Sequence, residues 1–260
     1  MKNPRHILIT GASSGIGASL AELYAKPNVT LSLHGRNAER LASIADKARR
    51  QGAEVAPHAG DVTNANNLAE WIVARHSALP LDLVIANAGI SAGAGKNAFE
   101  TATQSRAVFA TNLDGVLNTV YPVIPLMIAR KQGQLALVSS VASFRGFPGS
   151  ASYCASKSAI RALGESWRCD LQRYGIAVNV VCPGFIRTPM TEGNPYPMPW
   201  IMEADRAARL IRDGLARNKP CIAFPWRMVA MIGFLNLLPQ DWSNAMLRQF
   251  PSKPPRQTKT

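Results

Sequence analysis

The sequence predicts an α/β protein: a doubly wound parallel sheet flanked by helices, in a single domain that spans residues 1–250. Short β-branched runs alternate with longer helical stretches through most of the chain, which is typical of parallel strands joined by helical crossovers. A glycine-rich turn directly follows the first of these runs. The 260 residues are short for a second independent domain, and no linker precedes position 190.

The first half of the chain predicts four strands and three helices. The strands are expected at 6–10, 29–35, 54–62 and 81–89. The helices are expected at 15–26, at 38–52 and around 66–76. The second of these helices is amphipathic, and Gly52 ends it, because glycine readily adopts the left-handed conformation at a helix C-terminus.

The second half continues the pattern and then loosens. Strands are expected at 133–140 and 175–184, with a long helix at 152–174 between them. The stretch 188–200 holds four prolines and predicts a loop. After it come a helix at 203–217, a short strand at 221–224, an apolar stretch at 225–239 and a disordered basic tail at 251–260.

The composition limits the classes of partner. A net charge of +13 points to nucleic acid, an anionic membrane or phosphorylated ligands. Because the basic residues are dispersed and no nucleic-acid-binding signature accompanies them, we do not expect nucleic acid to bind. The four cysteines are scattered without metal-ligand spacing, which predicts reduced thiols in the cytoplasm and no metal site. No signal peptide or run of roughly 20 apolar residues is present, so we expect a soluble or peripheral protein.

The turn TGASSGIG, residues 10–17, predicts a dinucleotide site. Gly11 permits a tight turn, Gly15 lets the backbone approach a pyrophosphate, and Gly17 allows the helix to pack closely on the strand. The start of the helix offers free N–H groups to the phosphates. The intervening residues predicted to contact the cofactor are Ser13, Ser14 and Ile16.

The end of the second strand predicts which dinucleotide binds. An NAD site has a carboxylate here for the ribose hydroxyls, whereas an arginine suits the 2′-phosphate of NADP. The sequence has no acid at this point, but has Arg36 followed by Asn37. The residues therefore favour NADP(H); the alternative is that Arg36 is an ordinary surface arginine.

Tyr153 and Lys157 are the candidate catalytic pair. They lie four positions apart in a helical stretch and therefore share one face of the helix. A free tyrosine has a pKa of about 10, and a neighbouring ammonium group lowers that value by stabilising the phenolate. Tyr153 is thereby suited to general acid–base catalysis. On its own such a pair is usually an ordinary amphipathic face, so its neighbours in the sequence matter.

Those neighbours produce a clear resemblance. Ser140 ends a strand thirteen positions before Tyr153, Asn87-Ala88-Gly89 follows the fourth strand, and Asn112 lies within TNLDG. With the glycine turn and Pro183-Gly184, these motifs resemble the classical short-chain dehydrogenase/reductase family. The resemblance implies a Rossmann-like fold and an active oxidoreductase.

The resemblance also implies a role for each matching residue. Tyr153 would donate a proton to the carbonyl oxygen, and Lys157 would lower its pKa and bind the nicotinamide ribose. Ser140 would hold the substrate oxygen, and Asn112 would position a water of a proton relay. The further residues implied to contact the cofactor are Asp61, Val62, Asn87, Ala88, Gly89, Pro183, Gly184 and Thr188.

Two segments depart from the family pattern. The segment 225–250 replaces the usual C-terminal tetramer segment, so we expect a homodimer. Residues 225–239 are interpreted either as a helix buried against the protein or as an interfacial helix that docks on an anionic membrane. The loop 190–202 is expected to be an apolar lid that contacts the substrate through Met190 and Trp200.

The sequence thus predicts NADPH-dependent reduction of a hydrophobic, lipid- or acyl-like ketone or aldehyde. The same site can oxidise a secondary alcohol, which is the first alternative. The others are a binding module that senses NADPH and a scaffold on the membrane surface. A reductase of ketoacyl groups on an acidic carrier would also suit the basic surface.

Overall fold

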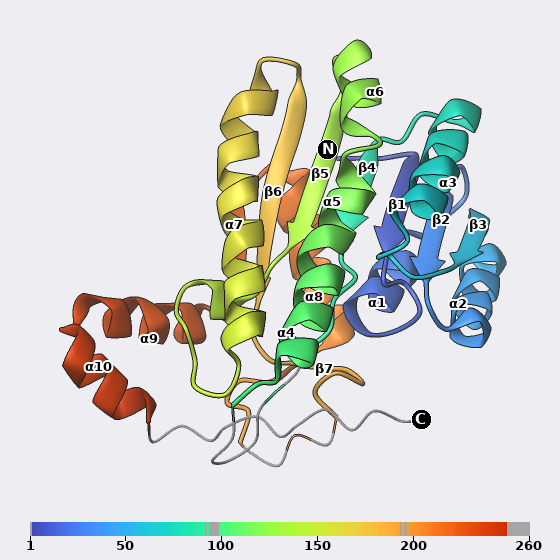
Figure 1. Cartoon of the computed structure of the whole chain (residues 1–260). Coiled ribbons are helices and arrows are strands. Elements are labelled where there is room, and N and C mark those ends of the chain that lie inside the picture. The colour runs from blue at the N-terminus through green and yellow to red at the C-terminus, as the bar shows by residue number, and fades with distance from the viewer. Residues whose placement is uncertain (1, 92, 94–98, 193, 195–196, 249–260) are drawn as a thin grey trace.

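The computed structural model describes residues 2–91, 93, 99–192, 194 and 197–248. Seven parallel strands form one sheet in the order β3-β2-β1-β4-β5-β6-β9 (Figure 1). The strands are β1 His6–Thr10, β2 Thr30–Gly35, β3 Glu54–Ala59, β4 Leu83–Ala86, β5 Gly133–Val138, β6 Ile176–Pro183 and β9 Cys221–Phe224. The predicted fold class, a single Rossmann-like domain, is confirmed; the basic tail 251–260 lies outside the described residues.

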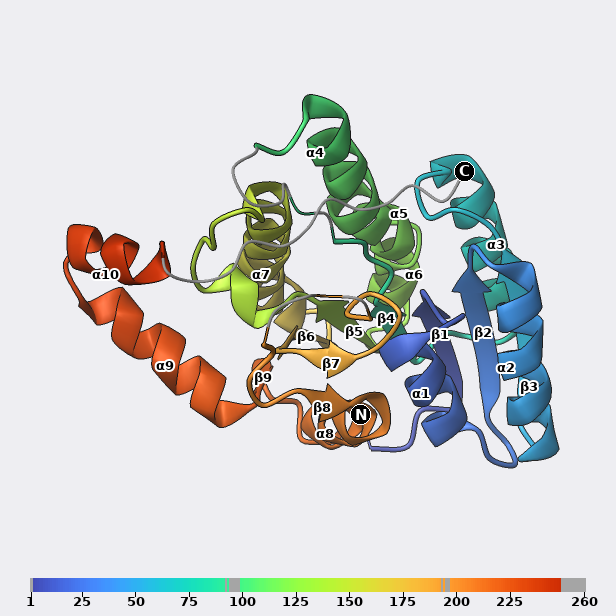
Figure 2. The same ribbon diagram turned by 90° about the horizontal axis from the view of Figure 1, so that it is seen from below.

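Helices cover both faces of the sheet, which appears between its two helical layers in Figure 2. One face carries α1 Gly15–Tyr24, α2 Ala38–Arg50 and α8 Ala204–Ala216. The other carries α3 Ala65–Ala78, α5 Gly115–Val120, α6 Ile124–Ala129 and α7 Ala151–Gln172. Because both faces are covered, the central strands are buried throughout: every residue of β1, β4 and β5 is buried, and most of them are apolar.

Local signals explain the helix boundaries. The Asn37 side chain accepts a hydrogen bond from Arg40 N at the start of α2. Leu41, Ile44, Ala45 and Ala48 form the buried stripe of that helix. Beyond its end, Gly52 has a φ of +90°, as the sequence predicted.

Several elements were not predicted. Helices α4 Ala102–Phe109, α5 and α6 occupy a stretch to which the sequence analysis assigned nothing, and a π-helical turn, Ala110–Asp114, joins α4 to α5. Helix α9, Trp226–Leu237, occupies the apolar stretch, and the unpredicted α10, Gln240–Leu247, follows it. None of the helices in the described part of the chain is long and apolar enough to cross a membrane.

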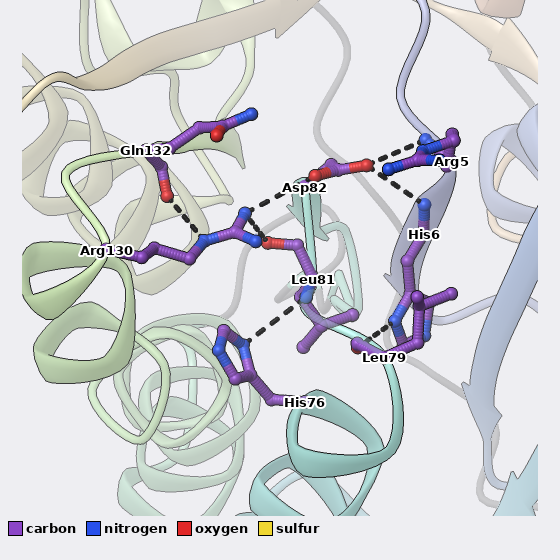
Figure 3. A network of polar contacts seen from close by, with 8 residues as sticks. All are labelled: Arg5, His6, His76, Leu79, Leu81, Asp82, Arg130 and Gln132. Atoms are coloured by element: carbon purple, nitrogen blue, oxygen red, sulfur yellow. Dashed lines mark hydrogen bonds and ion pairs between the residues drawn. The ribbon is translucent and has the colours of Figure 1, made fainter.

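A polar network closes the amino-terminal end of the sheet (Figure 3). Asp82 accepts hydrogen bonds from the backbone N–H groups of Arg5 and His6, at 2.8 and 3.3 Å. Its second oxygen lies 3.4 Å from Arg130 Nη2, which also donates to Leu81 O at 2.7 Å. These bonds tie the starts of β1 and β4 to the end of α6. The opposite, carboxyl-terminal end carries the candidate site.

Candidate active site

A cleft of about 1150 Å³ lies at the carboxyl ends of the strands. The strand order reverses between β1 and β4, and in open α/β sheets ligands bind in the crevice at such a switch point. The predicted site residues that line the cleft are Gly11, Ser13, Ser14, Gly15, Ile16, Arg36, Asn37, Val62, Asn87, Ala88, Gly89, Ser140, Tyr153, Lys157, Pro183, Gly184, Thr188 and Met190. Those outside the lining are Gly17, Asp61, Asn112 and Trp200.

The glycine turn has the geometry that a phosphate cradle needs. Gly11 and Gly15 have φ values of +67° and +55°, a backbone conformation that other residues rarely adopt. A Cβ atom at Gly17 would lie 2.3 Å from Gly11 O, so only glycine lets α1 begin this close to the turn. Asn87 Nδ2 donates to Thr10 O at 2.9 Å and holds the turn against β4. The N-terminus of α1 therefore faces the cleft with its backbone exposed to a ligand.

Two arginines line the cleft where β2 ends. Arg36 precedes α2, and Arg40, which the sequence analysis missed, lies one turn further along. Its place in the first turn of the helix that follows Arg36 was the signal that could have identified the second arginine. Arg36 Nη1 also lies 3.6 Å from Asp61 Oδ2. Both guanidinium groups can therefore approach a single anionic group at this end of the cleft.

Asp61 lies beside this cationic end rather than in the cleft wall. Burial alone would raise the pKa of its carboxyl group, but hydrogen bonds from Thr63 N and Oγ1, each 2.9 Å long, lower it, as does Arg36. The carboxylate is thus held in its charged form and partly neutralises Arg36. The implied adenine contact of Asp61 stays a prediction.

His34 is a further cleft residue that the sequence analysis did not assign. Its side chain is 1% exposed, and within the described residues neither ring nitrogen has a hydrogen-bond partner. Its ring centroid lies 5.6 Å from that of His58 and 6.0 Å from that of Trp71. Burial, with a contribution from His58, lowers the pKa of His34 to about 4, so the ring is neutral at neutral pH.

Tyr153 and Lys157 lie on one face of α7 and line the same cleft. Lys157 is 4% exposed, and its Nζ donates to Val138 O at 2.8 Å. The same Nζ lies 6.0 Å from the centroid of the Tyr153 ring. Burial lowers the pKa of Lys157 to about 8, so the group is still mostly a cation at neutral pH. A buried cation beside a phenol stabilises the phenolate.

Asn112 is fully buried behind this pair, in the π-helical turn. Its Oδ1 accepts from Ile90 N at 2.7 Å, and its Nδ2 donates to Ile90 O at 3.0 Å and Ser156 Oγ at 3.1 Å. A Cβ atom at Gly89 would lie 3.3 Å from Asn112 Oδ1 and 3.4 Å from Lys157 Nζ. Both groups therefore converge on one point next to Gly89. Such π-helical turns frequently occur at functional sites.

Ser140 presents its hydroxyl group to the cleft from the end of β5. The Oγ atom accepts from Ala142 N at 3.1 Å and donates to Pro183 O across a long 3.3 Å. The preceding Ser139 also lines the cleft, and its Oγ donates to Lys157 O at 2.6 Å, which ties β5 to α7. Ser140, Tyr153 and Lys157 thus line a single cleft from two elements that are fastened together.

The far wall of the cleft is apolar. Met228, Met231 and Ile232 of α9 line it, a contribution that the sequence analysis did not predict. Met190 lines the cleft from the predicted lid, in which residues 193, 195 and 196 lie outside the described residues. Trp200 does not reach the lining: it has a φ of +55° and is 40% exposed. The further apolar residues of this region are Phe147, Pro148, Phe185, Pro197 and Pro199.

Comparisons with known proteins agree on one family. The model of the short chain dehydrogenase family matches residues 5–196. The chain is 38% identical over 247 residues to an uncharacterised oxidoreductase of Myxococcus xanthus, covering 94% of this chain and 97% of the relative. It is 35% identical over 194 residues to the 3-oxoacyl-acyl-carrier-protein reductase FabG of Thermotoga maritima, covering 72% and 76% of the two chains.

The fold has close counterparts among solved structures. A short-chain dehydrogenase from Sphingobium yanoikuyae, solved in complex with NADPH, superimposes with a TM-score of 0.79 at 25% identity. The alignment covers 98% of both chains, and therefore includes the C-terminal helices.

Proposed function

This chain belongs to the short-chain dehydrogenase family, and on that basis we propose that it reduces a hydrophobic ketone or aldehyde to an alcohol with NADPH. The observation that carries the proposal is the convergence of Tyr153, Lys157 and Ser140 on one cleft that also contains the glycine turn. A nicotinamide cofactor of this family transfers a hydride when it is bound. The chain's own residues would hold the carbonyl and supply the proton.

We assign Tyr153 as the proton donor. As hydride reaches the carbonyl carbon, negative charge develops on the oxygen, and the phenol O–H of Tyr153 donates its proton to that oxygen. The Lys157 cation stabilises the phenolate that remains, because the two groups lie together in a buried site. Asn112, which is buried behind Tyr153 and Lys157, would position Lys157 and the solvent around it.

Ser140 is assigned to the substrate oxygen. Its hydroxyl group accepts a hydrogen bond from Ala142 N, and among the described residues its own proton makes only the long bond to Pro183 O. That proton can be donated to the developing oxyanion, where a preorganised donor stabilises the transition state more than the ground state.

The preference for NADPH rests on the cationic end of the cleft. Arg36 and Arg40 both line it, and a guanidinium group can bind a phosphate through two hydrogen bonds. Asp61 is already paired with Arg36, which reduces its repulsion of a phosphate. Oxidation of an alcohol by NADP in the same site remains the alternative direction.

The substrate is proposed to be apolar and acyl-like. Methionine, phenylalanine and proline side chains surround the end of the cleft beyond Ser140 and Tyr153. The relative from Thermotoga maritima is named as a reductase of 3-oxoacyl groups on the acyl carrier protein, which supports a carbonyl of this class. A net charge of +13 would favour an acidic carrier.

The test is NADPH oxidation against carbonyl compounds that range from sugars to long-chain and polycyclic ketones. We expect turnover that rises with hydrophobicity and falls by about 10³-fold in Tyr153→Phe, with NADPH binding retained. Tyr174→Phe, which removes a hydroxyl group beyond the C-terminal end of the same helix, is the matched control. NADPH binding without turnover of any compound would contradict the reductase proposal and favour a sensor.

The homodimer and the cytoplasmic location predicted from the sequence remain predictions. Light scattering on the purified chain measures the first, and fractionation of the producing cell measures the second.

A further inference from the structure

Helices α9 and α10 carry a concentration of exposed large apolar side chains. Figures 1 and 2 show both helices projecting from one side of the body. Of the twelve exposed large hydrophobic residues in the described ranges, five belong to these two helices. We call these five the outer face: Trp226, Phe234, Leu237, Trp242 and Met246. Leu237 and Trp226 are 84% and 72% exposed, and five such side chains on two neighbouring helices form a patch rather than scattered single residues.

Helix α9 is apolar on two sides that have different surroundings. Met228, Ile232 and Leu235 are buried, and they follow the i, i+4, i+7 spacing of an inward stripe. Trp226, Phe234 and Leu237 point away from that stripe. A Cβ atom at Gly233 would meet nothing within 4 Å, so the outward side is open. One wall of the helix therefore lines the substrate cleft, while the other remains without a partner in the described structure.

The outward orientation of these side chains is held by specific bonds. Arg145 donates to Asn236 Oδ1 at 3.2 Å and to Ser243 Oγ at 2.5 Å, and so joins α9 to α10. Asn236 Nδ2 donates back to Phe144 O at 3.0 Å. These bonds fix how α9 and α10 sit on the segment at Phe144 and Arg145, and with the buried stripe of α9 they keep the outer face turned outward.

The charge of this region is complementary to an anionic surface. Among the described residues from position 225 onward, the basic residues are Arg227 and Arg248 and the acidic residue is Asp241. Arg145, which donates to Asn236 and Ser243, adds a third guanidinium group beside the two helices. Apolar aromatic side chains flanked by arginine and lysine are typical of helices that lie in the interface of an anionic bilayer.

We propose that the outer face docks on the surface of an anionic lipid bilayer, with α9 and α10 lying in the plane of the interface. The twelve residues of α9 extend only about 18 Å, which is too short to cross the hydrocarbon core. Tryptophan is favoured at this depth because its ring is apolar and its N–H still reaches water. Docking would bring the α9 wall of the cleft next to the lipid in which an apolar substrate dissolves.

A second copy of the chain suits the outer face less well. A symmetric pair would place two copies of the same patch against each other, and each copy would bring the same excess of arginine to the interface. Like charges opposed in this way oppose association. The excess of basic residues favours an anionic partner, and the bilayer supplies both that charge and an apolar layer.

The experiment is sedimentation of the full chain with vesicles of phosphatidylcholine containing phosphatidylglycerol, compared with phosphatidylcholine alone. We expect binding to the anionic vesicles, and a partition coefficient about tenfold or more lower in the double variant Phe234→Ser/Leu237→Ser. Arg248→Glu should weaken binding in low salt more than in high salt. The matched control is Val73→Ser/Leu210→Ser, which removes two exposed aliphatic residues from α3 and α8.

Light scattering and turnover of a water-soluble ketone accompany each variant. The proposal predicts that the outer-face variants keep their mass and their turnover and lose only vesicle binding. It is overturned if wild type does not bind anionic vesicles, or if the control variant loses binding equally. It is also overturned if the outer-face variant changes a dimer into a monomer while vesicle binding is unchanged. Vesicle binding and mass, which decide the outcome, do not depend on the proposed reaction.

Discussion

The two walls of the cleft are built on different principles. The wall at the strand ends consists of backbone and buried polar groups, each held by bonds of defined length, such as Lys157 Nζ to Val138 O at 2.8 Å. The α9 wall consists of flexible methionine and aliphatic side chains, and Arg145 ties α9 to the rest of the domain. The first wall is specified by geometry and the second by volume and hydrophobicity.

The difference separates two tasks. Chemistry needs a few polar groups within a fraction of an ångström of the correct position, which only a rigid, hydrogen-bonded wall supplies. Recognition of an apolar substrate needs a large apolar contact area rather than precisely directed hydrogen bonds. Flexible side chains supply that area. Changes in the first wall should therefore affect turnover and cofactor binding, and changes in the second should affect the choice of substrate.

The largest effect is expected from Lys157→Met. Turnover should fall by about 10³-fold, because the phenolate of Tyr153 loses its cation. At neutral pH the variant should nonetheless be more stable by about 1–3 kcal/mol, since a cation whose pKa is lowered by burial destabilises the fold.

The pH dependence identifies the cause of that gain. In wild type the destabilisation is fully present below the folded pKa of about 8 and disappears as the pH rises toward the unfolded value of about 10.4. Urea unfolding of both proteins across this range should therefore show the difference shrinking as pH rises. A constant difference would contradict the account.

The next largest effect is expected from Arg36→Ala. Loss of charged hydrogen bonds to a 2′-phosphate should raise the KM for NADPH by about 10- to 100-fold and leave that for NADH nearly unchanged. Arg50→Ala, at the C-terminal end of α2, the helix that follows Arg36, is the matched control. An equal rise in KM for both cofactors would mean that Arg36 does not bind the 2′-phosphate.

His34→Phe tests a buried group of the first wall. Between its folded pKa of about 4 and its unfolded value of about 6.5, the unfolded state binds more protons than the folded state. His34 therefore lowers the free energy of unfolding of wild type as the pH falls through this window. Between about pH 7 and about pH 5, the free energy of unfolding of the phenylalanine variant should fall by about 1–2 kcal/mol less than that of wild type. Unfolding in urea at both pH values measures it; identical pH dependence would contradict a buried, neutral imidazole.

The smallest effect is expected from Arg145→Ala. Removing the bonds to α9 and α10 should raise the KM for an apolar ketone by about three- to tenfold while the Kd of NADPH is unchanged. Limited proteolysis should also cut the C-terminal helices sooner. A variant that loses cofactor affinity would show that the two walls are coupled.

The sequence predicted the first wall better than the second for a physical reason. Gly11 and Gly17 are required by backbone geometry, and a spacing of four places Tyr153 and Lys157 on one helix face, so local patterns identify them. His34 was missed because its burial depends on His58 and Trp71, which come from other elements.

The second wall depends on contacts that no local pattern contains. Residues 225–239 were expected to be a helix, either buried against the protein or docked on a membrane. Which side of α9 faces the cleft is decided by its packing on residues near Phe144 and Phe147. Met190 reaches the lining and Trp200 does not, although both belong to the same proline-rich loop. No element was predicted for residues 102–129, where the structure has three short helices and a π-helical turn between the first two.

The separation of the two walls is tested most directly by reduction of a homologous series of straight-chain ketones in wild type and Met231→Ser. In wild type, kcat/KM should rise with each added methylene, since burying one contributes up to about 0.8 kcal/mol. In the variant the rise should flatten while the Kd of NADPH and turnover of the shortest ketone stay the same. An unchanged slope of kcat/KM against chain length would contradict the account. So would a variant that loses both cofactor binding and the turnover of every ketone.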